Sequence, residues 1–357
     1  MARGLAPEVV DTLQGVRASS TRRQYGSKWR QFDAWCRAQS PLVDPLQAPV
    51  GAVLLFLQSV LDRGRCHETI KGLVAAISAC REGLGNPPLS QDGLVRDFLK
   101  AARRRSSTAR PLLPSWDLAL VLGTLCGPPF EPIEALDLKM LSLKTVFLVA
   151  ITTAKRVSDL HALSVSRECL RFDEAGRRVL LQPNLAFVTK TQAVAMDPVE
   201  LCAFHPPPFQ SDEDSRLHCL CPVRALQHYV QKTAAVRGPT SQLFVTIGPG
   251  RAAGKAVAKP TLTRWLLDAI RLAYTSKGGE PPGGLRAHST RAVASSWAVA
   301  RGVSMQEVCM AANWSSASTF AAFYRLDVAA PSLAHAVLGV ADPLVQGLAL
   351  AAGAGPA

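Results

Sequence analysis

Residues 288–325 read HSTRAVASSWAVARGVSMQEVCMAANWSSASTFAAFYR, and this stretch constrains the fold and the chemistry of the chain more than any other. Apolar residues recur in it at helical spacing over 289–301, 304–311 and 316–325, which predicts three short helices in succession. His288 and Arg291 are three residues apart, so on a helix they share one face. Trp314 follows the second helix, and Tyr324 lies near the end of the third. The stretch therefore predicts a helical region with polar and aromatic groups near the helix ends.

Upstream of this stretch, helical patterns flank a short segment with strand character. Further helices are expected at 115–125, 142–153, 222–235 and 261–274. Two short strands are expected at 178–181 and 185–190, joined by a turn at Pro183 and Asn184. The proline-rich and acidic segment 204–215 is expected to be a surface loop. We therefore expect residues 115–342 to form one mixed α/β domain, mainly α with a small antiparallel sheet.

The first third of the chain predicts a separate all-α domain, and the length of 357 residues allows two cores. Tyr25, Trp29 and Phe32 recur at helical spacing, and further helical patterns follow at 49–63, 67–84 and 91–105. Short breakers separate these patterns, so we expect a compact helical domain over residues 19–106. The remaining segments are predicted as an arm at 1–18, a basic linker at 107–114 and a disordered tail at 343–357.

The charge of the chain favours a polyanionic partner. The formal net charge is +13 and the isoelectric point about 9.6. Residues 1–110 hold 17 Lys and Arg against 9 Asp and Glu, so most of the surplus lies in the first third. Such a surplus is typical of proteins that bind the phosphate backbone of double-stranded DNA. The basic residues that we expect to contact DNA are Arg22, Arg23, Lys28, Arg103, Arg104 and Arg105.

The composition argues against several other classes of protein. With 48% hydrophobic and 19% charged residues, the chain is typical of a folded protein rather than a disordered one. No apolar stretch approaches the ~20 residues that span a membrane, and no signal-peptide core follows Met1. We therefore expect neither a membrane partner nor secretion. The nine cysteines are scattered, which indicates reduced thiols in an intracellular compartment.

Three more polar residues precede the decisive stretch. The segment AKRVSDL at 154–160 places Arg156 and Asp159 three residues apart near a helix start, and Lys190 ends an expected strand. Each has an ordinary explanation: a structural ion pair for the first two and a solvated side chain for the lysine. The information lies in the order and combination of these residues with those of 288–325.

The ordered set resembles the catalytic set of the tyrosine recombinase/phage integrase family. Its members are Arg156, Lys190, His288, Arg291, Trp314 and Tyr324. The wording is most similar to recombinases of DIRS-like retrotransposons and related eukaryotic mobile elements, in TRRQYGSKWRQFDAWC at 21–36, LCPVRAL at 220–226 and WSSASTF at 314–320. The resemblance covers residues 19–328. It implies an N-terminal helical core-binding (SAM-like) domain and a C-terminal catalytic domain that clamp DNA, a homo-tetramer on DNA, and action in the nucleus.

The resemblance also implies how DNA would be cut and rejoined. Arg156 and Arg291 would bind the scissile phosphate, a task that suits the planar guanidinium, which can bind two phosphate oxygens at once. Tyr324 would attack the phosphorus to form a 3′-phosphotyrosine, and Lys190 would protonate the departing 5′ oxygen. Because the phosphotyrosine keeps the energy of the broken ester, strand exchange would need no cofactor. The implied function is DNA strand cleavage, exchange and rejoining in the integration of a mobile element.

The remaining members of the set have supporting roles under the same resemblance. His288 would transfer a proton or donate to the phosphate, because imidazole titrates near neutral pH. Trp314 would donate its indole N–H and buttress the site. Asp159 would orient Arg156 or His288.

Several alternatives remain open at this point. The chain can be a catalytically inert DNA-binding protein derived from such a recombinase. Lys155 is the other lysine near Arg156, and Phe323 stands beside Tyr324 but has no hydroxyl with which to attack phosphorus. A zinc site is disfavoured because the spacings fit no standard finger pattern; the residues concerned are Cys202, His205, His218, Cys219 and Cys221.

Overall fold

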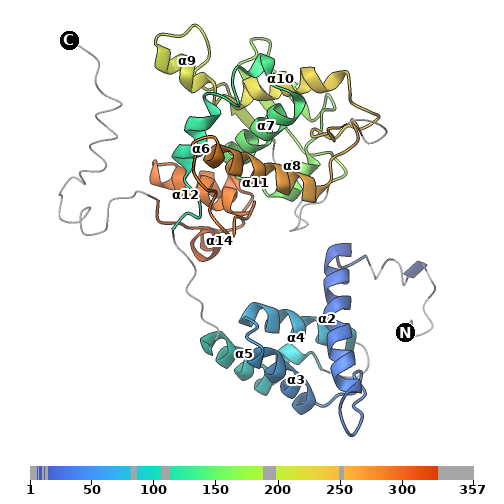
Figure 1. Cartoon of the computed structure of the whole chain (residues 1–357). Coiled ribbons are helices and arrows are strands. Elements are labelled where there is room, and N and C mark those ends of the chain that lie inside the picture. The colour runs from blue at the N-terminus through green and yellow to red at the C-terminus, as the bar shows by residue number, and fades with distance from the viewer. Residues whose placement is uncertain are drawn as a thin grey trace, which may run out of the picture. The chain divides into compact units, whose positions relative to one another are not determined.

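The computed structural model describes residues 15–81, 87–105, 113–187, 198–248 and 253–328, with isolated positions before residue 15. The chain divides into two compact units, Met1–Arg110 and Pro111–Ala357, and each has its own hydrophobic core. Figure 1 draws the first unit from blue to teal and the second from green to red. The fold is mainly helical with a small antiparallel sheet, as the sequence predicts. No helix in the described ranges is both long and apolar enough to cross a membrane.

The first unit packs its helices around an aromatic centre. Its described elements are α2 (Ser19–Arg37), α3 (Val50–Asp62), α4 (His67–Arg81), η1 (Leu89–Gln91) and α5 (Gly93–Arg105). Phe32 of α2 and Phe56 of α3 are buried, with ring centroids 5.2 Å apart. Arg81 at the end of α4 donates to the carbonyl of Ala48 at 2.6 Å, which ties α4 to the chain before α3. Trp29 and Phe32 of the aromatic stripe predicted along α2 therefore face this core.

The second unit is built around α7 (Leu138–Thr153), which Figure 1 shows in its middle. Residues 141–150 of α7 are all buried, as expected for a helix that neighbours cover on every side. The helices α10, α11 and α12 pack against it. The other elements of this unit are α6 (Leu118–Leu125), η2 (Ile133–Ala135), α8 (Val157–Ala162), α9 (Asp212–His218), α10 (Pro222–Ala234), α11 (Lys259–Thr275), α12 (Ser289–Ala300), α13 (Met305–Ala311) and α14 (Ala317–Phe323).

The two ends of α7 are set by local chemistry. The carboxylate of Asp137 accepts a hydrogen bond from the backbone N–H of Met140 at 2.7 Å and caps the helix start. The helix ends at Ala154, which has the left-handed backbone conformation common after helices (φ 49°). This turn redirects the chain so that Arg156 begins α8 two residues later.

The antiparallel sheet has the order β1–β2–β3, formed by Leu170–Phe172, Arg178–Leu181 and Val199–Cys202. The strand predicted at 185–190 is wrong over residues 185–187, which follow a turn at Asn184; residues 188–190 lie outside the described ranges and are not tested. The carbonyl and side-chain oxygens of Asn184 accept from the backbone N–H groups of Phe187 and Ala186, at 2.8 and 2.9 Å. Asparagine thus bends the chain here, and β1 and β3 take the two edges of β2.

The surface loop predicted at 204–215 is wrong at its end, where α9 begins at Asp212. The hydroxyl of Ser211 accepts from the backbone N–H of Asp214 at 3.1 Å and caps the helix. The first turn holds three acidic residues, which the positive end of the helix dipole favours. The acidic run is therefore a helix start.

A buried ion network joins α7 to its neighbours. Lys144 is fully buried; its amine donates to the carbonyls of Leu125 at 2.9 Å and Phe130 at 3.2 Å, and it pairs with Glu131. Arg224 of α10 also pairs with Glu131, at 2.8 Å. Burial lowers the pKa of Lys144. Burial alone would raise the pKa of Glu131, but hydrogen bonds from Arg224 and Lys144 outweigh it and lower that pKa.

We expect Glu131→Gln to destabilise the second unit. The change leaves the buried amine of Lys144 without an opposite charge, which costs about 3–5 kcal/mol when one partner of a buried pair is removed. The free energy of unfolding, measured by urea titration, reports this loss.

A matched control is Glu213→Gln, because Glu213 is exposed and pairs only across one turn with Arg216. We expect at most a small loss for that variant, well below that of Glu131→Gln, from the exposed pair and the helix dipole. Because the folded-state pKa of Glu131 lies below its ordinary value of 4.5, its contribution is present above pH 4.5 and is lost as the pH falls further. Equal stability of Glu131→Gln and wild type at pH 7 would contradict the structural role of the network.

Candidate active site

The helix α12 positions His288 and Arg291. His288 precedes the first helical residue and is exposed, whereas Arg291 lies within the first turn and is only 1% exposed. The guanidinium of Arg291 donates through Nη2 to the carbonyl of Ala312. Its Nε and Nη1 are buried and have no hydrogen-bond partner among the described residues. An unmet buried donor costs about 1–3 kcal/mol, and more when it is charged, so this guanidinium is arranged for a partner that the described chain does not supply.

Two aromatic rings enclose this guanidinium. The Cζ atom of Arg291 is 4.6 Å from the ring centroid of Trp314 and 5.2 Å from that of Tyr324. The ring centroids of Trp314 and Tyr324 are 4.5 Å apart, and those of His288 and Tyr324 are 5.1 Å apart. Cation–π contacts of this kind stabilise a desolvated charge. Four members of the predicted set therefore converge on one place.

Trp314 is held by the turn that follows α13. Asn313 adopts a left-handed backbone conformation (φ 53°), which asparagine tolerates better than most residues. The backbone N–H of Trp314 then donates to the carbonyl of Cys309 at 2.8 Å. The indole is 7% exposed, and its Nε1 is a buried donor for which the described residues provide no acceptor. A third unmet donor thus accompanies the two of the Arg291 guanidinium.

Tyr324 ends α14, and its backbone N–H donates to the carbonyl of Phe320 at 2.8 Å. Phe320 is buried, and Phe323 is 68% exposed. Tyr324 itself is 7% exposed. The tyrosine, and not Phe323, is therefore the side chain of this helix end that lies against Arg291.

Arg156 immediately precedes α8, and its charge acts on Arg291. Its backbone N–H donates to the carboxylate of Asp159 at 3.2 Å, and the hydroxyl of Ser158 donates to the same carboxylate at 3.1 Å. Burial, and next the positive charge of Arg156, lower the pKa of Arg291 to about 10; Tyr324 and Asp159 act in the opposite direction. At neutral pH Arg291 is still charged, so two guanidinium charges act on each other beside a phenol. Such an arrangement suits a phosphate group, which would pair with both charges.

The structure describes six of the seven residues predicted for the catalytic site: Arg156, Asp159, His288, Arg291, Trp314 and Tyr324. Lys190 lies outside the described residues. The alternative lysine, Lys155, is buried, with 6% exposure. The carboxylate of Asp159 is buried and holds the backbone at Arg156.

The residues predicted to contact DNA belong to the first unit. Arg22 and Arg23 are exposed on α2, and Lys28 on the same helix is half-buried. Three consecutive arginines, Arg103, Arg104 and Arg105, are exposed in the last turn of α5. That helix end therefore offers a dense positive charge to solvent.

One residue at the site is absent from the sequence prediction. Ser296 of α12 is 3% exposed, and its hydroxyl contacts the backbone on both sides of Arg325. A hydroxyl inside an apolar helical pattern is the signal that marks it, but that signal does not name the partner.

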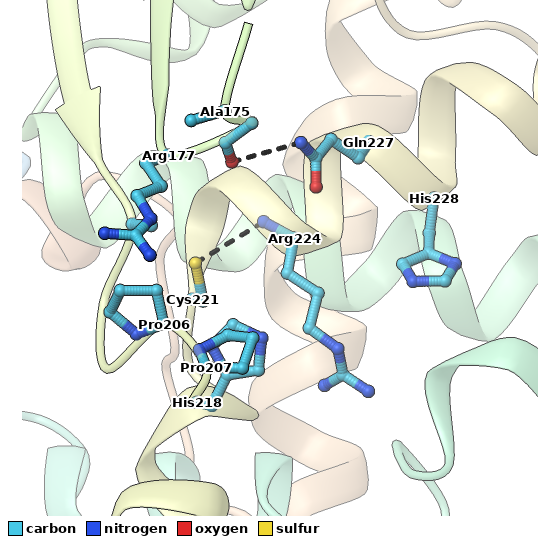
Figure 2. Close-up of a pocket in the computed structure, with 11 residues that line it drawn as sticks. Ala175, Arg177, Pro206, Pro207, His218, Cys221, Arg224, Gln227 and His228 are labelled. Carbon is cyan, nitrogen blue, oxygen red and sulfur yellow. Dashed lines mark hydrogen bonds between the residues drawn. The ribbon is translucent and has the colours of Figure 1, made fainter. Parts of the chain in front are cut away.

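A separate cleft of about 400 Å³ lies beside α10, and Figure 2 shows Arg224, Gln227 and His228 projecting from that helix. Its polar groups already hold the fold: Nδ1 of His218 bonds to the carbonyl of Phe204 at 3.0 Å, and the sulfur of Cys221 accepts from the backbone N–H of Arg224 at 3.4 Å. Elsewhere in the same region His205 pairs with Asp214 at 2.7 Å. Within the described ranges, no three His, Cys, Asp or Glu side chains are grouped to hold a metal ion.

Comparisons with known proteins show the fold. No family model matches the sequence, and no curated protein matches it. The Tn1549 transposon integrase, solved in complex with transposon right end DNA, aligns with a TM-score of 0.57 and 13% identity over 95% of this chain and 96% of that one. XerH site-specific recombinase bound to a palindromic difH substrate aligns with a TM-score of 0.55 and 14% identity, over 85% of this chain and 76% of that one. A lambda integrase dimer bound to a COC′ core site aligns with a TM-score of 0.50 and 16% identity, over 87% of this chain and 73% of that one. The fold is therefore that of tyrosine recombinases and integrases.

We expect Arg291→Met to raise the stability of the DNA-free protein. The variant replaces a buried charge with two unmet donors by an apolar side chain of similar length, and the lost cation–π contacts offset only part of the gain. The net increase should be about 1 kcal/mol in the free energy of unfolding by urea titration.

The control is Arg301→Met, because Arg301 also lies over an indole, that of Trp297 at 5.3 Å, but is exposed. That variant should show no gain. A clear loss of stability for Arg291→Met would mean that the guanidinium has its hydrogen-bond partners within the fold and does not require an anion.

Proposed function

We propose that this chain is a tyrosine recombinase that cleaves and rejoins DNA through a 3′-phosphotyrosine at Tyr324. The observation that carries the proposal is the buried guanidinium of Arg291, with two unmet donors, packed against the ring of Tyr324. A phosphodiester would accept from those donors and would bring its phosphorus to the tyrosine. The proteins with the same fold include recombinases solved in complex with DNA, which supports DNA as the partner.

The proposed step conserves bonds and protons. The phenol oxygen of Tyr324 forms a bond to phosphorus, the bond from phosphorus to the 5′ oxygen breaks, and the phenol proton passes to a base. His288 is the proposed base or proton relay, because its ring lies 5.1 Å from that of Tyr324. The departing oxygen takes a proton, for which Lys190 is the proposed donor. Arg156 and Arg291 stabilise the charge on the non-bridging oxygens.

The wider biological role is also a proposal. The similarity in wording to DIRS-like recombinases supports integration of a mobile element in a eukaryotic nucleus. Exchange between two duplexes requires four strands to be cut and rejoined, which supports a homo-tetramer on DNA. The positive surface of the first unit, at Arg103, Arg104 and Arg105, supports phosphate contacts that position the duplex.

We expect Tyr324→Phe to abolish covalent attachment to DNA and to leave DNA binding within about threefold of wild type, because the phenyl ring keeps the packing. The substrate is a set of nicked duplexes tiled across the DNA that flanks the coding sequence, and the adduct is measured on denaturing gels. Phe323→Leu is the matched control at the neighbouring, exposed position and should keep the adduct. An adduct that survives Tyr324→Phe would exclude Tyr324 as the nucleophile. Binding without any adduct from wild type would favour the inert DNA-binding protein.

We also expect the three arginines at the end of α5 to control the salt dependence of binding. Each phosphate neutralised contributes about 0.9 to the slope of log affinity against log salt. Replacing Arg103, Arg104 and Arg105 by glutamine should reduce that slope by about two to three, measured by fluorescence anisotropy. Arg37→Gln is the control, because Arg37 is exposed on α2 but already pairs with Asp33 at 3.0 Å. An unchanged slope in the triple variant would remove α5 from the proposed interface.

A further inference from the structure

We propose that Ser296 is a positioning residue that holds the tyrosine segment 324–326 against α12, an inference that rests on the proposed role of Tyr324. The hydroxyl of Ser296 donates to the carbonyl of Tyr324 at 3.3 Å and accepts from the backbone N–H of Leu326 at 2.8 Å. Ser296 is 3% exposed, so water does not compete freely for these two bonds.

The contact joins α12 to the chain that follows α14. Ser296 lies on the same helix as Arg291, so one rigid element carries both the guanidinium and the anchor of the tyrosine. On its other side, the tyrosine is held by the short helix α14, which ends where the backbone N–H groups of Tyr324 and Arg325 share the carbonyl of Phe320. A helix of two turns is marginal on its own. The bridge to α12 therefore sets the distance between the phenol and the guanidinium.

The chain offers a closely matched control at the adjacent position. Ser295 is also buried, at 1% exposure, but its hydroxyl donates to the carbonyls of Arg291 and Ala292 within α12 itself. Serine-to-alanine at either position removes one buried hydroxyl from the same turn. Only the change at Ser296 disconnects the tyrosine segment.

We expect Ser296→Ala to slow formation of the covalent adduct by about 10- to 100-fold at saturating DNA, since a misplacement near 1 Å costs that much. Its DNA affinity should stay within about threefold of wild type, so that the loss lies in the rate and not in binding. Ser295→Ala should stay within about threefold in rate. Ser296→Thr keeps the hydroxyl and should recover a part of the rate. Equal rates for the two alanine variants, or a loss in affinity that accounts for the whole effect, would overturn the proposal.

A second measurement does not depend on catalysis. Amide hydrogen exchange at Leu326 should be at least tenfold faster in Ser296→Ala than in wild type and unchanged in Ser295→Ala, because only the first variant removes the acceptor for that N–H. If wild type forms no adduct, the proposed function fails, and the exchange rate still decides whether Ser296 holds this segment. Unchanged exchange at Leu326 in Ser296→Ala would refute the bridge itself.

Discussion

The candidate site of the second unit is organised around one buried charge, the guanidinium of Arg291. Taking this group out of water is unfavourable. Among the described residues, one hydrogen bond to the carbonyl of Ala312 and two aromatic faces compensate for part of that cost. The remaining donors have no partner among the residues that the structure describes. An anionic ligand would complete this arrangement, and without one the same site would be more stable if it were apolar. The preorganised donors then need no rearrangement when an anion arrives.

The scaffold explains how two arginines far apart in the sequence act on one site. The helix α7 is buried all round and packs against α12, which carries Arg291, while the turn at Ala154 leads directly from α7 to Arg156. One rigid helix therefore relates both guanidinium groups. The other end of α7 is fixed by the ion network of Lys144, Glu131 and Arg224, so its position does not depend on apolar packing alone. Apolar packing is tolerant of small shifts, whereas hydrogen-bonded charges are directional.

Much of this fold follows from periodicity, and the exceptions have physical reasons. The long helices were predictable because their apolar faces repeat, and the limits of α10, α12 and α13 agree with the expected ranges within one residue. The start of the strand expected at 185–190 was wrong because its apolar residues resemble a strand, while Asn184 makes a turn over 184–187 through its own side chain. The helix α9 escaped prediction because its signal is a cap with acidic residues rather than an apolar stripe.

The site shows a sharper limit of sequence reasoning. The order of Arg156, His288, Arg291, Trp314 and Tyr324 indicates chemistry, but spacing says nothing about how deeply each group is buried. His288 and Arg291 lie three residues apart, yet His288 precedes α12 and is exposed, whereas Arg291 lies in its first turn and is 1% exposed. That difference arises from α13 and α14, which cover Arg291 and bring the carbonyl of Ala312 to it. The contacts of Ser296 are equally hidden from the sequence, because its partners, the backbone groups of Tyr324 and Leu326, come from a tertiary contact.

The charges of Arg156 and Arg291 also bear on anion binding. Burial and the charge of Arg156 both weaken the hold of Arg291 on its proton, although a pKa of about 10 leaves it charged at neutral pH. A bound phosphate would reverse the repulsion, because a negative charge between two positive ones favours the charged form of each. It would also satisfy the donors that the fold leaves unmet. Since such a ligand would bind the folded state alone, the free energy lost in burying Arg291 without partners would be recovered on binding, and the site would be most stable when occupied.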